Sequence, residues 1–204
     1  MGEFKIIHYN FTHCYLIPTI DGWLMIDNDM PGTLAELWKA VKGAGVRWEE
    51  VRWLLVTHFH PDHGGLTGGI KNEERKLILL DKQVNTRNEQ GKYVKTHAHP
   101  FAEITLEDTV ILAEADSCEF LRSIGVAGQL LWTPGHSSDS VSLLLDDGGA
   151  FVGDLTHYDY LPMYEDEVLH ASWRKLRTAG ARRIHSGHWP VYDLPAEEEV
   201  TNAR

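Results

Sequence analysis

The sequence has few cysteines, no long hydrophobic run and no recognisable targeting segment. Cys14 and Cys118 stand apart, outside any Cys-x-x-Cys pair, so we expect reduced thiols and a cytoplasmic location. The longest apolar runs, such as residues 77–80 and 143–145, have the length of strands and are too short to span a membrane. Residues 1–7 lack the basic and apolar regions of a signal peptide. We therefore expect neither a disulfide framework nor a membrane span.

Positive charge is also scarce. The chain has 19 Lys and Arg against 30 Asp and Glu, which gives a formal net charge of −11. Such an acidic surface repels nucleic-acid phosphates and anionic lipids, so we expect a small-molecule substrate, no nucleic-acid partner and no membrane partner. With 204 residues, 43% of them hydrophobic, and no Pro/Ser-rich linker, residues 1–204 are predicted to form a single domain. The sequence leaves the oligomeric state open.

The hydrophobic pattern changes between strand and helix periods along the chain. Helical spacing predicts one helix from Leu34 to the glycines at 43–45, another over 116–124 and a third over 165–178, with Val168, Leu169, Trp173 and Leu176 on one face. The first two carry apparent capping pairs, Thr33 with Glu36 and Asp116 with Glu119. Residues 83–100 are predicted to cross the surface, and 195–204 to form a charged tail. Strands are predicted at 4–7, 14–18, 23–26, 51–57, 76–81, 109–112, 129–133, 141–145, 150–152 and 183–186, with a hairpin turn at 146–149.

Histidine is abundant, with twelve in the chain, and it clusters with an aspartate directly after the predicted strand 51–57. Four potential metal ligands fall within six residues, in the order His58, His60, Asp62 and His63. His58 and His60 are two positions apart, so their side chains can point the same way. Imidazole and carboxylate together suit Zn²⁺, with iron or manganese as alternatives. Four such residues in one tight loop have no packing role to explain them.

Three more potential ligands follow later strands, and each has a glycine directly before it. They are His136 in Thr-Pro-Gly-His-Ser, Asp154 in Val-Gly-Asp and His188 in Ser-Gly-His. Glycine lets the backbone come close to a ligand or an ion. Strand ends on a rigid sheet are also where functional groups gather in many proteins. These positions therefore extend the candidate metal site.

With these motifs the sequence resembles the metallo-β-lactamase-fold hydrolases. The motifs HxHxDH at 58–63, PGHS at 134–137, GD at 153–154 and SGH at 186–188 match that superfamily's pattern over nearly the whole chain. The resemblance implies an α+β fold, a four-layer αββα sandwich of two mixed β-sheets with helices on the outer faces and a metal pair at one edge. It also implies that His58, His60 and His136 hold the first metal, that Asp62, His63 and His188 hold the second, and that Asp154 bridges them.

The chemistry of these residues agrees with that implication. Seven ligands are too many for one tetrahedral ion and suit two ions, predicted to be Zn²⁺, that share a carboxylate and a solvent oxygen. Such a site would use a bridging hydroxide to cleave an ester, lactone or thioester bond of a small molecule. Asp62 is predicted to be catalytic, since it would orient the nucleophile and carry its proton to the leaving group.

Comparison with particular members narrows the expected substrate. Asp154 stands where the thiolate-using antibiotic hydrolases have cysteine, and an intact His60 argues against the flavin-linked di-iron members. Glyoxalase II (hydroxyacylglutathione hydrolase) and related thioesterases share the bridging aspartate, although only a short segment follows His188 here. Acyl-homoserine lactonases share the full ligand set and have a tyrosine shortly after that aspartate. Tyr158 is therefore predicted to be a catalytic hydrogen-bond donor, with Tyr160 in the same neighbourhood.

Other functions remain open at this point. The same metals would serve a phosphodiesterase or nuclease, although no basic patch supports one. A mononuclear-iron oxidoreductase acting on a sulfur substrate and a metal-binding module without catalysis are further alternatives. His157 and Trp189 lie close enough in sequence to Asp154 and His188 to line a substrate pocket.

Overall fold

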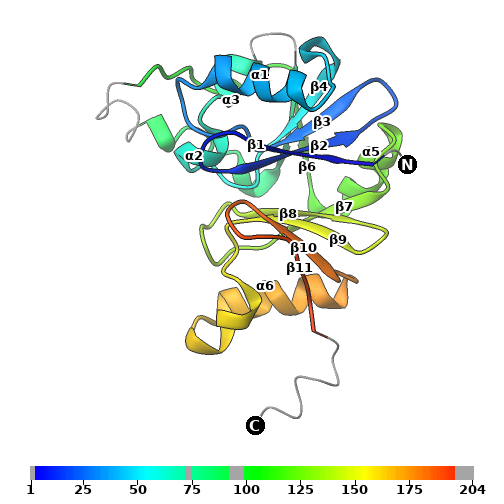
Figure 1. The fold of residues 1–204 in the computed structure, drawn as a ribbon. Helices are drawn as coiled ribbons and strands as arrows, with labels where there is room; N and C mark the ends of the chain where they lie inside the picture. The colour runs from blue at the N-terminus through cyan, green and yellow to red at the C-terminus, as the bar shows by residue number, and fades with distance from the viewer. Residues whose placement is uncertain (1–2, 72–74, 92–98, 196–204) are drawn as a thin grey trace.

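Two β-sheets pack face to face, with helices on both outer sides (Figure 1). The structure is a computed structural model and describes residues 3–71, 75–91 and 99–195. In the first sheet, β1 to β3 are antiparallel neighbours, and β3 to β6 run parallel to one another. Its strands, in spatial order, are β1 (Lys5–His8), β2 (His13–Pro18), β3 (Trp23–Ile26), β4 (Val51–Leu55), β5 (Lys76–Leu80) and β6 (Thr109–Leu112).

The second sheet is also mixed. β10 runs parallel to β9, and the other neighbouring pairs are antiparallel. The hairpin predicted at residues 146–149 is confirmed, because β8 and β9 pair across it. In spatial order the strands are β11 (Tyr192–Asp193), β10 (Arg183–Ser186), β9 (Gly149–Gly153), β8 (Val141–Leu145) and β7 (Gly128–Trp132).

Side chains point alternately to the two faces along each strand, and this explains how the first sheet is buried on both faces. In β2, Tyr15 and Ile17 belong to the core between the sheets, whereas Cys14 and Leu16 belong to the core beneath the helices. This division follows from the two-residue period of a strand. Phe151 of β9 meets Tyr15 from the second sheet, with the ring centroids 4.8 Å apart. The largest core thus lies between the two sheets.

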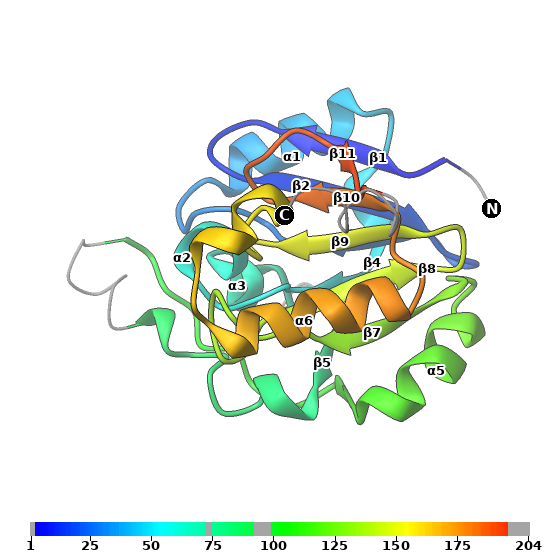
Figure 2. The ribbon, with the colours of Figure 1, turned by 90° about the horizontal axis from the view of Figure 1, so that it is seen from below.

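Helices complete the outer layers. α1 (Leu34–Gly43) and α3 (Thr67–Lys71) cover the first sheet, and α6 (Glu167–Thr178) lies across the second, as Figure 2 shows. α5 (Ser117–Ser123) adds Leu121 to the core between the sheets. The predicted αββα sandwich is confirmed. The short helices are α2 (Pro61–Gly64), η1 (Trp48–Glu50), η2 (Asp81–Gln83), η3 (Glu114–Asp116) and η4 (Tyr158–Met163).

Both predicted capping pairs are wrong. The Thr33 hydroxyl makes no cap for α1, because it donates to the carbonyl oxygen of Met30 at 2.7 Å and meets the Tyr9 hydroxyl at 3.0 Å. Asp116 lies inside η3 and likewise makes no side-chain cap. Among the longer helices in the described ranges, α6 does have a side-chain cap, because Asp166 accepts from two backbone amides at its start. A polar residue before a helix is therefore not enough to cap it when another donor or acceptor is nearer.

Several other boundaries and faces differ from the predictions. β4 ends at Leu55, so the turn begins earlier than expected, and Asp62 lies in α2 rather than in a loop. Val168 is 51% exposed and does not share the buried face of α6. Gln83 and Gln90 are buried within the stretch expected on the surface, because their amides donate to the backbone oxygens of Val56 and Gly64. Residues 92–98 and 196–204 of the predicted surface segment and tail lie outside the described residues.

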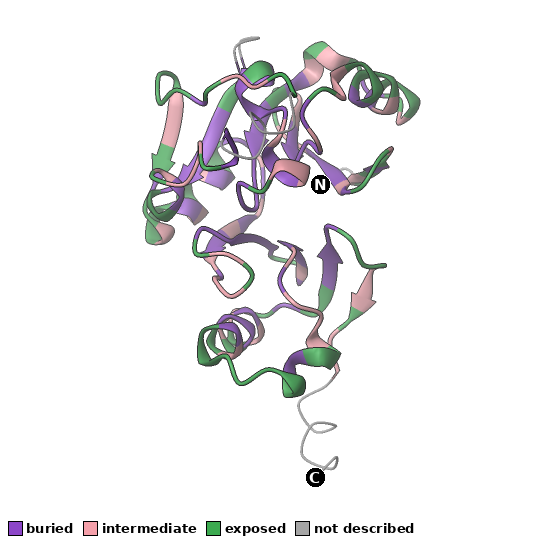
Figure 3. Ribbon diagram, turned by 90° about the vertical axis from the view of Figure 1, so that its left-hand side faces the viewer, coloured by how far each residue is buried: buried purple, intermediate pink, exposed green. Residues whose placement is uncertain are grey.

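The topology brings several loops to one edge of the sandwich, onto which Figure 3 looks. β3 and β4 are parallel, so the segments that follow them leave the first sheet at the same edge. β7, β9 and β10 point toward that edge from the second sheet. None of the helices in the described ranges has the length and apolar character that crossing a membrane requires. The edge is therefore the place where residues from distant parts of the sequence meet.

Candidate metal centre

Three histidines form the first group of candidate ligands. His58 and His60 follow β4, and His136 follows β7. Nδ1 of His60 lies 3.0 Å from Nε2 of His58 and 3.0 Å from Nε2 of His136. His58 is buried, while the other two rings are exposed at the rim. The structure thus brings together the three imidazoles that the sequence motifs assign to one ion.

A second group contains two carboxylates and two imidazoles. Asp62 and His63 come from α2, Asp154 follows β9 and His188 follows β10. Nε2 of His188 lies 3.2 Å from an Asp62 oxygen and 3.3 Å from an Asp154 oxygen. Nε2 of His63 lies 3.1 Å from the other Asp154 oxygen and 3.4 Å from Nε2 of His188. All four side chains therefore face one another.

Asp154 lies between the two groups. One of its oxygens is 3.7 Å from Nε2 of His136 in the first group, as well as facing His188 in the second. Gly187 has to be a glycine, because a Cβ there would lie 2.9 Å from an Asp154 oxygen and 2.5 Å from the His63 ring. Gly153 is needed too, since its φ is 55° and a Cβ there would meet the Thr57 hydroxyl. These two glycines give the close approach that their place in the motifs predicts.

Hydrogen bonds behind the second group fix which ring nitrogens face inward. Nδ1 of His63 lies 2.8 Å from a carboxylate oxygen of Asp27, a residue that is buried directly after β3. Nδ1 of His188 lies 3.0 Å from the backbone oxygen of Phe11. Each of these Nδ1 atoms therefore carries the proton and donates, which leaves Nε2 directed at the other candidate ligands. Metal-binding histidines are oriented in this way.

The two groups differ in their acid–base state. Burial lowers the pKa of His58 well below its ordinary value, and burial also lowers that of His136. Hydrogen bonds to Asp154 and Asp62 raise the pKa of His188 to about 10. Burial alone would lower the pKa of His63, but Asp27 and Asp154 outweigh it and raise that pKa to about 10. In the first group His58 and His136 are therefore neutral imidazoles, whereas the second group binds protons strongly in the place that a cation would take.

The donor set fits a pair of divalent metal ions. Asp154 Oδ1 is buried, and within the described residues it forms an ion pair with Nε2 of His63 at 3.1 Å without hydrogen-bond geometry. Burial raises the pKa of Asp154, but the hydrogen bond from His188 and the charge of His63 outweigh it and hold that pKa well below its usual range, so this carboxylate is ionised. A buried, ionised carboxylate needs positive charge beside it, which a divalent ion would supply in place of the protons on the two imidazoles. Imidazole nitrogens and carboxylate oxygens are ligands that suit Zn²⁺ and iron.

Asp27 and Thr57 support the site and were missed from the sequence. Asp27 accepts hydrogen bonds from the Thr57 amide at 2.8 Å and from the Thr57 hydroxyl at 2.8 Å. That hydroxyl also lies 3.3 Å from Nδ1 of His58, so Thr57 contacts both groups from behind. The signal was present, because a polar residue directly after a strand marked the other site residues too. Asp27 could not be linked to the site from the sequence, since nothing around it shows that β3 lies beside β4.

The aromatic residues proposed for the pocket make two separate sets of ring contacts. The ring of Tyr158 packs against Trp173 of α6 at 5.3 Å, and the Arg177 guanidinium lies over it. No contact of Tyr158 with a candidate ligand is present among the described residues, so its catalytic role stays a prediction. Tyr160, His157 and Trp189 contact one another, with ring centroids 5.5 to 5.8 Å apart. Trp189 directly follows His188, which puts this cluster next to the second group.

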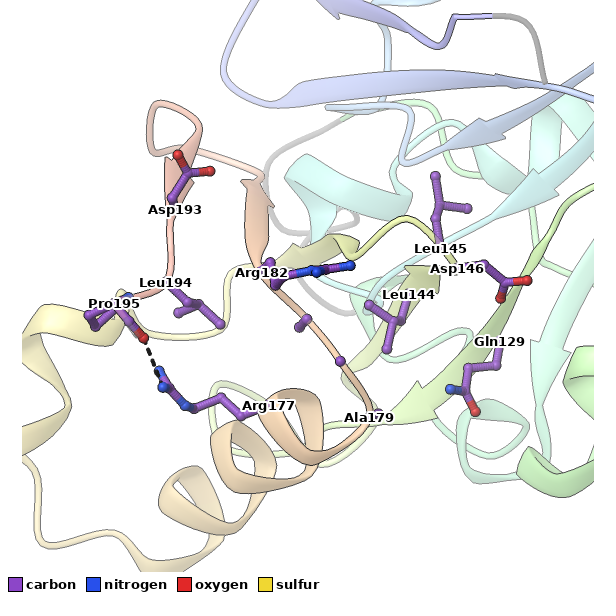
Figure 4. A pocket seen from close by; sticks show the side chains of 12 residues that line it. Gln129, Leu144, Leu145, Asp146, Arg177, Ala179, Arg182, Asp193, Leu194 and Pro195 are labelled. Carbon is purple, nitrogen blue, oxygen red and sulfur yellow. Dashed lines mark hydrogen bonds between the residues drawn. The ribbon is translucent and has the colours of Figure 1, made fainter. Parts of the chain in front are cut away.

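One cavity lies away from the candidate ligands and another lies beside them. A cavity of about 750 Å³ lies beside α6, and Arg177 donates there to the backbone oxygen of Pro195 (Figure 4). None of its lining residues is a candidate ligand. A smaller cavity of about 500 Å³ opens at the candidate metal centre instead. It is lined by Phe11, Met30, His60, Pro61, Asp62 and His188. The smaller cavity, unlike the larger one, is lined by residues of both groups.

Known proteins show the same family signature. The model of the metallo-beta-lactamase superfamily matches residues 9–188. A "Beta-lactamase-like protein 2 homolog" from Caenorhabditis elegans is 27% identical over 92% of this chain and 59% of its own length. An atrochrysone carboxyl ACP thioesterase from Aspergillus fumigatus is 27% identical over 89% of the chain and 52% of its length. An N-acyl homoserine lactonase from Bacillus cereus is 26% identical over 65% and 57%. The chain thus spans little more than half the length of these relatives.

Solved structures share the fold. The B3 metallo-beta-lactamase BLEG-1 superimposes with a TM-score of 0.70 at 21% identity, covering 94% of both chains. A protein crystallised in a di-iron-bound form superimposes with a TM-score of 0.66 at 24% identity, covering 89% of both chains. At this level of identity the likeness concerns the fold alone.

Proposed function

Because this chain belongs to the metallo-beta-lactamase superfamily, we propose that it hydrolyses an ester, lactone or thioester of a small molecule with two divalent metal ions. The superfamily consists mostly of metal-dependent hydrolases, and the relatives include a thioesterase and a lactonase. The observation that carries the proposal is that seven potential ligands form two adjacent groups, with the buried carboxylate of Asp154 facing both. We propose Zn²⁺ as the metal, because imidazole ligands predominate.

Each ion would be held by one group. His58, His60 and His136 would hold the first ion, and Asp62, His63 and His188 the second, with Asp154 between them. Divalent ions supply, when bound, a Lewis-acidic environment that polarises a scissile carbonyl oxygen and lowers the pKa of water. The hydrogen bonds from His63 to Asp27 and from His188 to Phe11 keep both Nε2 atoms facing the site.

Asp62 is the residue that we propose moves the proton. Burial raises its pKa, but the hydrogen bond with His188 and the charge of His63 more than offset this, so the net pKa lies below its ordinary value. Asp62 is therefore ionised at neutral pH and can accept a proton. It lines the cavity at the centre, where its carboxylate can orient an attacking water and pass the proton to the leaving group.

We propose a small-molecule substrate because the cavity at the centre measures about 500 Å³, which suits a small molecule. The net charge of −11 opposes a nucleic-acid partner. Cys14 and Cys118 are both unpaired, which supports our proposal of a reducing, cytoplasmic location.

The test is a substrate panel with protein loaded with Zn²⁺. We expect turnover of an aryl ester, a lactone or a thioester, and complete loss after chelation with recovery on adding Zn²⁺. Asp62→Asn should lower kcat by about 10²- to 10⁴-fold while the protein keeps most of its zinc, since general-base catalysis contributes about that much.

Matched controls separate the alternatives. Asp21→Asn removes an exposed carboxylate that accepts from Trp53 far from the centre, so it should leave the rate unchanged. Turnover of a phosphodiester alone would replace the proposal with a phosphodiesterase. One iron per chain in protein purified without added metal would favour a mononuclear oxidoreductase. Unchanged turnover in Asp62→Asn would remove the catalytic role of Asp62.

A further inference from the structure

Asp29 is a buried carboxylate beside the candidate centre, outside the ligand groups. It is 0% exposed and follows β3 by three residues. One oxygen accepts from the Asn10 side-chain amide at 3.0 Å and from the Met30 backbone amide at 2.6 Å. The other accepts from the backbone amides of Phe11 at 3.0 Å and Thr12 at 3.1 Å. Four donors on one carboxylate hold the loop between β1 and β2 against the segment after β3.

The loop that Asp29 holds contacts two candidate ligands of the second group. The Phe11 backbone oxygen accepts from Nδ1 of His188 at 3.0 Å. The Thr12 hydroxyl donates to the backbone oxygen of Asp62 at 2.6 Å. Asp29 therefore reaches His188 through Phe11 and reaches Asp62 through Thr12. A carboxylate that fixes the partners of ligands in this way sets their orientation.

The same carboxylate fixes the apolar wall of the cavity. Phe11 and Met30 are the nonpolar side chains, besides Pro61, that line the cavity of about 500 Å³, and both have their backbone amides bound to Asp29. The Phe11 side chain is 62% exposed although its backbone is held firmly. Ligand pockets are lined mainly by hydrophobic and aromatic side chains with a few polar groups, and Phe11 and Met30 beside Asp62 and His188 form such a lining.

The backbone conformation at Asp29 points to a selected residue rather than a default one. Its φ is 63°, in the left-handed region that glycine adopts most easily. Aspartate tolerates this region better than most residues, but glycine would adopt it with less strain. A carboxylate at this position is therefore there for its four hydrogen bonds.

We propose that Asp29 is a positioning residue that couples an apolar acyl-binding wall, formed by Phe11 and Met30, to the candidate ligands His188 and Asp62. The substrate class is an ester, lactone or thioester with an extended apolar acyl chain. This inference rests on the proposed hydrolytic function. The scissile carbonyl would lie toward Asp62 and His188, and the acyl chain would lie along Phe11 and Met30.

The first experiment measures chain-length dependence with zinc-loaded protein and a series of linear acyl thioesters from acetyl to octanoyl. For the wild type we expect kcat/KM to rise about two- to fourfold with each methylene that the wall covers. Phe11→Ala should flatten this rise. Asp29→Asn should flatten it too and should also lower kcat for every chain length, because it disturbs both the wall and the ligands.

The second experiment does not depend on turnover. In zinc-loaded protein, NMR of the His188 ring measures solvent exchange of the Nδ1 proton that is bonded to Phe11. We expect at least tenfold faster exchange in Asp29→Asn and in Asp29→Gly, and faster loss of zinc to a chelator. Glycine adopts the same φ without strain, so a loss in Asp29→Gly must come from the missing carboxylate.

Leu176→Ala is the matched control for lost stability. Leu176 is fully buried on α6, so its truncation destabilises the fold far from the loop. We expect this control to keep the chain-length slope and the slow His188 exchange. Wild-type slope and exchange in Asp29→Asn would overturn the inference and leave the proposed function intact. A wild type that cleaves no ester, lactone or thioester would defeat the proposed function and the acyl wall, while exchange and zinc retention would still decide the role of Asp29.

Discussion

The two groups of candidate ligands differ in charge and in support, although they lie side by side. The first group consists of three imidazoles, His58, His60 and His136, and contains no carboxylate. Within the described residues, Nδ1 of His58 has one polar contact, the Thr57 hydroxyl at 3.3 Å. The second group has two carboxylates, and both of its imidazoles donate to fixed acceptors, a buried aspartate and a backbone oxygen.

This difference shows how one fold can prepare two unlike sites for the same kind of ion. In the first group, burial keeps the imidazoles of His58 and His136 neutral and so ready for a cation. The second group can bind a cation because its carboxylates attract positive charge. Protons on His63 and His188 carry that charge here. The first group should therefore bind metal with little change in protonation, and the second should exchange protons for metal.

Removing the residue between the groups should have the largest effect. Asp154→Ala takes away the carboxylate that contacts His136, His63 and His188. We expect kcat/KM to fall by about 10³-fold or more, because several kcal/mol of transition-state stabilisation depend on metals held together. Elemental analysis should show less than two zinc ions per chain.

The control for that variant lies at the other end of the same strand. Asp147→Ala removes a carboxylate that accepts from Gly149 at the start of β9, whereas Asp154 follows its end. It should keep the activity and zinc content of the wild type. Full activity in Asp154→Ala would contradict the view that the two groups act as one centre.

Removing support from one group should separate the two. Asp27→Asn weakens the hydrogen bond that orients His63 and leaves the first group's rings in place. Zinc affinity should fall by about 10- to 100-fold at the second group, the usual effect of losing such a partner. Titration with a chromophoric chelator would resolve one weakened and one unaffected ion.

Asp21→Asn serves again as the control, since Asp21 lies before β3 and Asp27 follows it. Equal weakening of both ions in Asp27→Asn would show that Thr57 transmits the change to His58, and the two groups would then have to be treated as one.

The parts of this fold that could be predicted from sequence are those with a local signal. Strands such as β2 and β5 appear as short apolar stretches. Four candidate ligands appear as a dense cluster directly after a strand, and three more appear as polar residues after glycine at strand ends. The structure brings those seven residues together because parallel strands direct their carboxyl ends to one edge. β11 has only two residues, too few for any period to show.

The missed features depend on partners that are distant in sequence. Asp27 and Asp29 gain their roles only because β3 lies beside β4 and the β1–β2 loop folds over both. Their positive φ angles are likewise invisible in a sequence where aspartate usually marks a polar loop. Val168 has helical spacing with its neighbours on α6, but the direction of the sheet decides which side of that helix is covered.

Taken per pH unit, the smallest effect expected here is the pH dependence of metal binding. His63 and His188 have pKa values raised to about 10, so at pH 7 a metal ion must displace a proton from the second group. Their Nε2 atoms are 3.4 Å apart, and two charged rings would repel, so we expect release of at least one proton. Affinity there should rise about tenfold per pH unit for each proton released, up to pH 10. His58 and His136 have lowered pKa values and are already neutral at pH 7, so these two ligands should release no proton when metal binds to the first group at pH 7 or above. Zinc calorimetry in buffers of different ionisation enthalpy measures the protons released with each ion. Equal proton release with both ions would mean that the two groups share one acid–base state, against the comparison drawn from their charges.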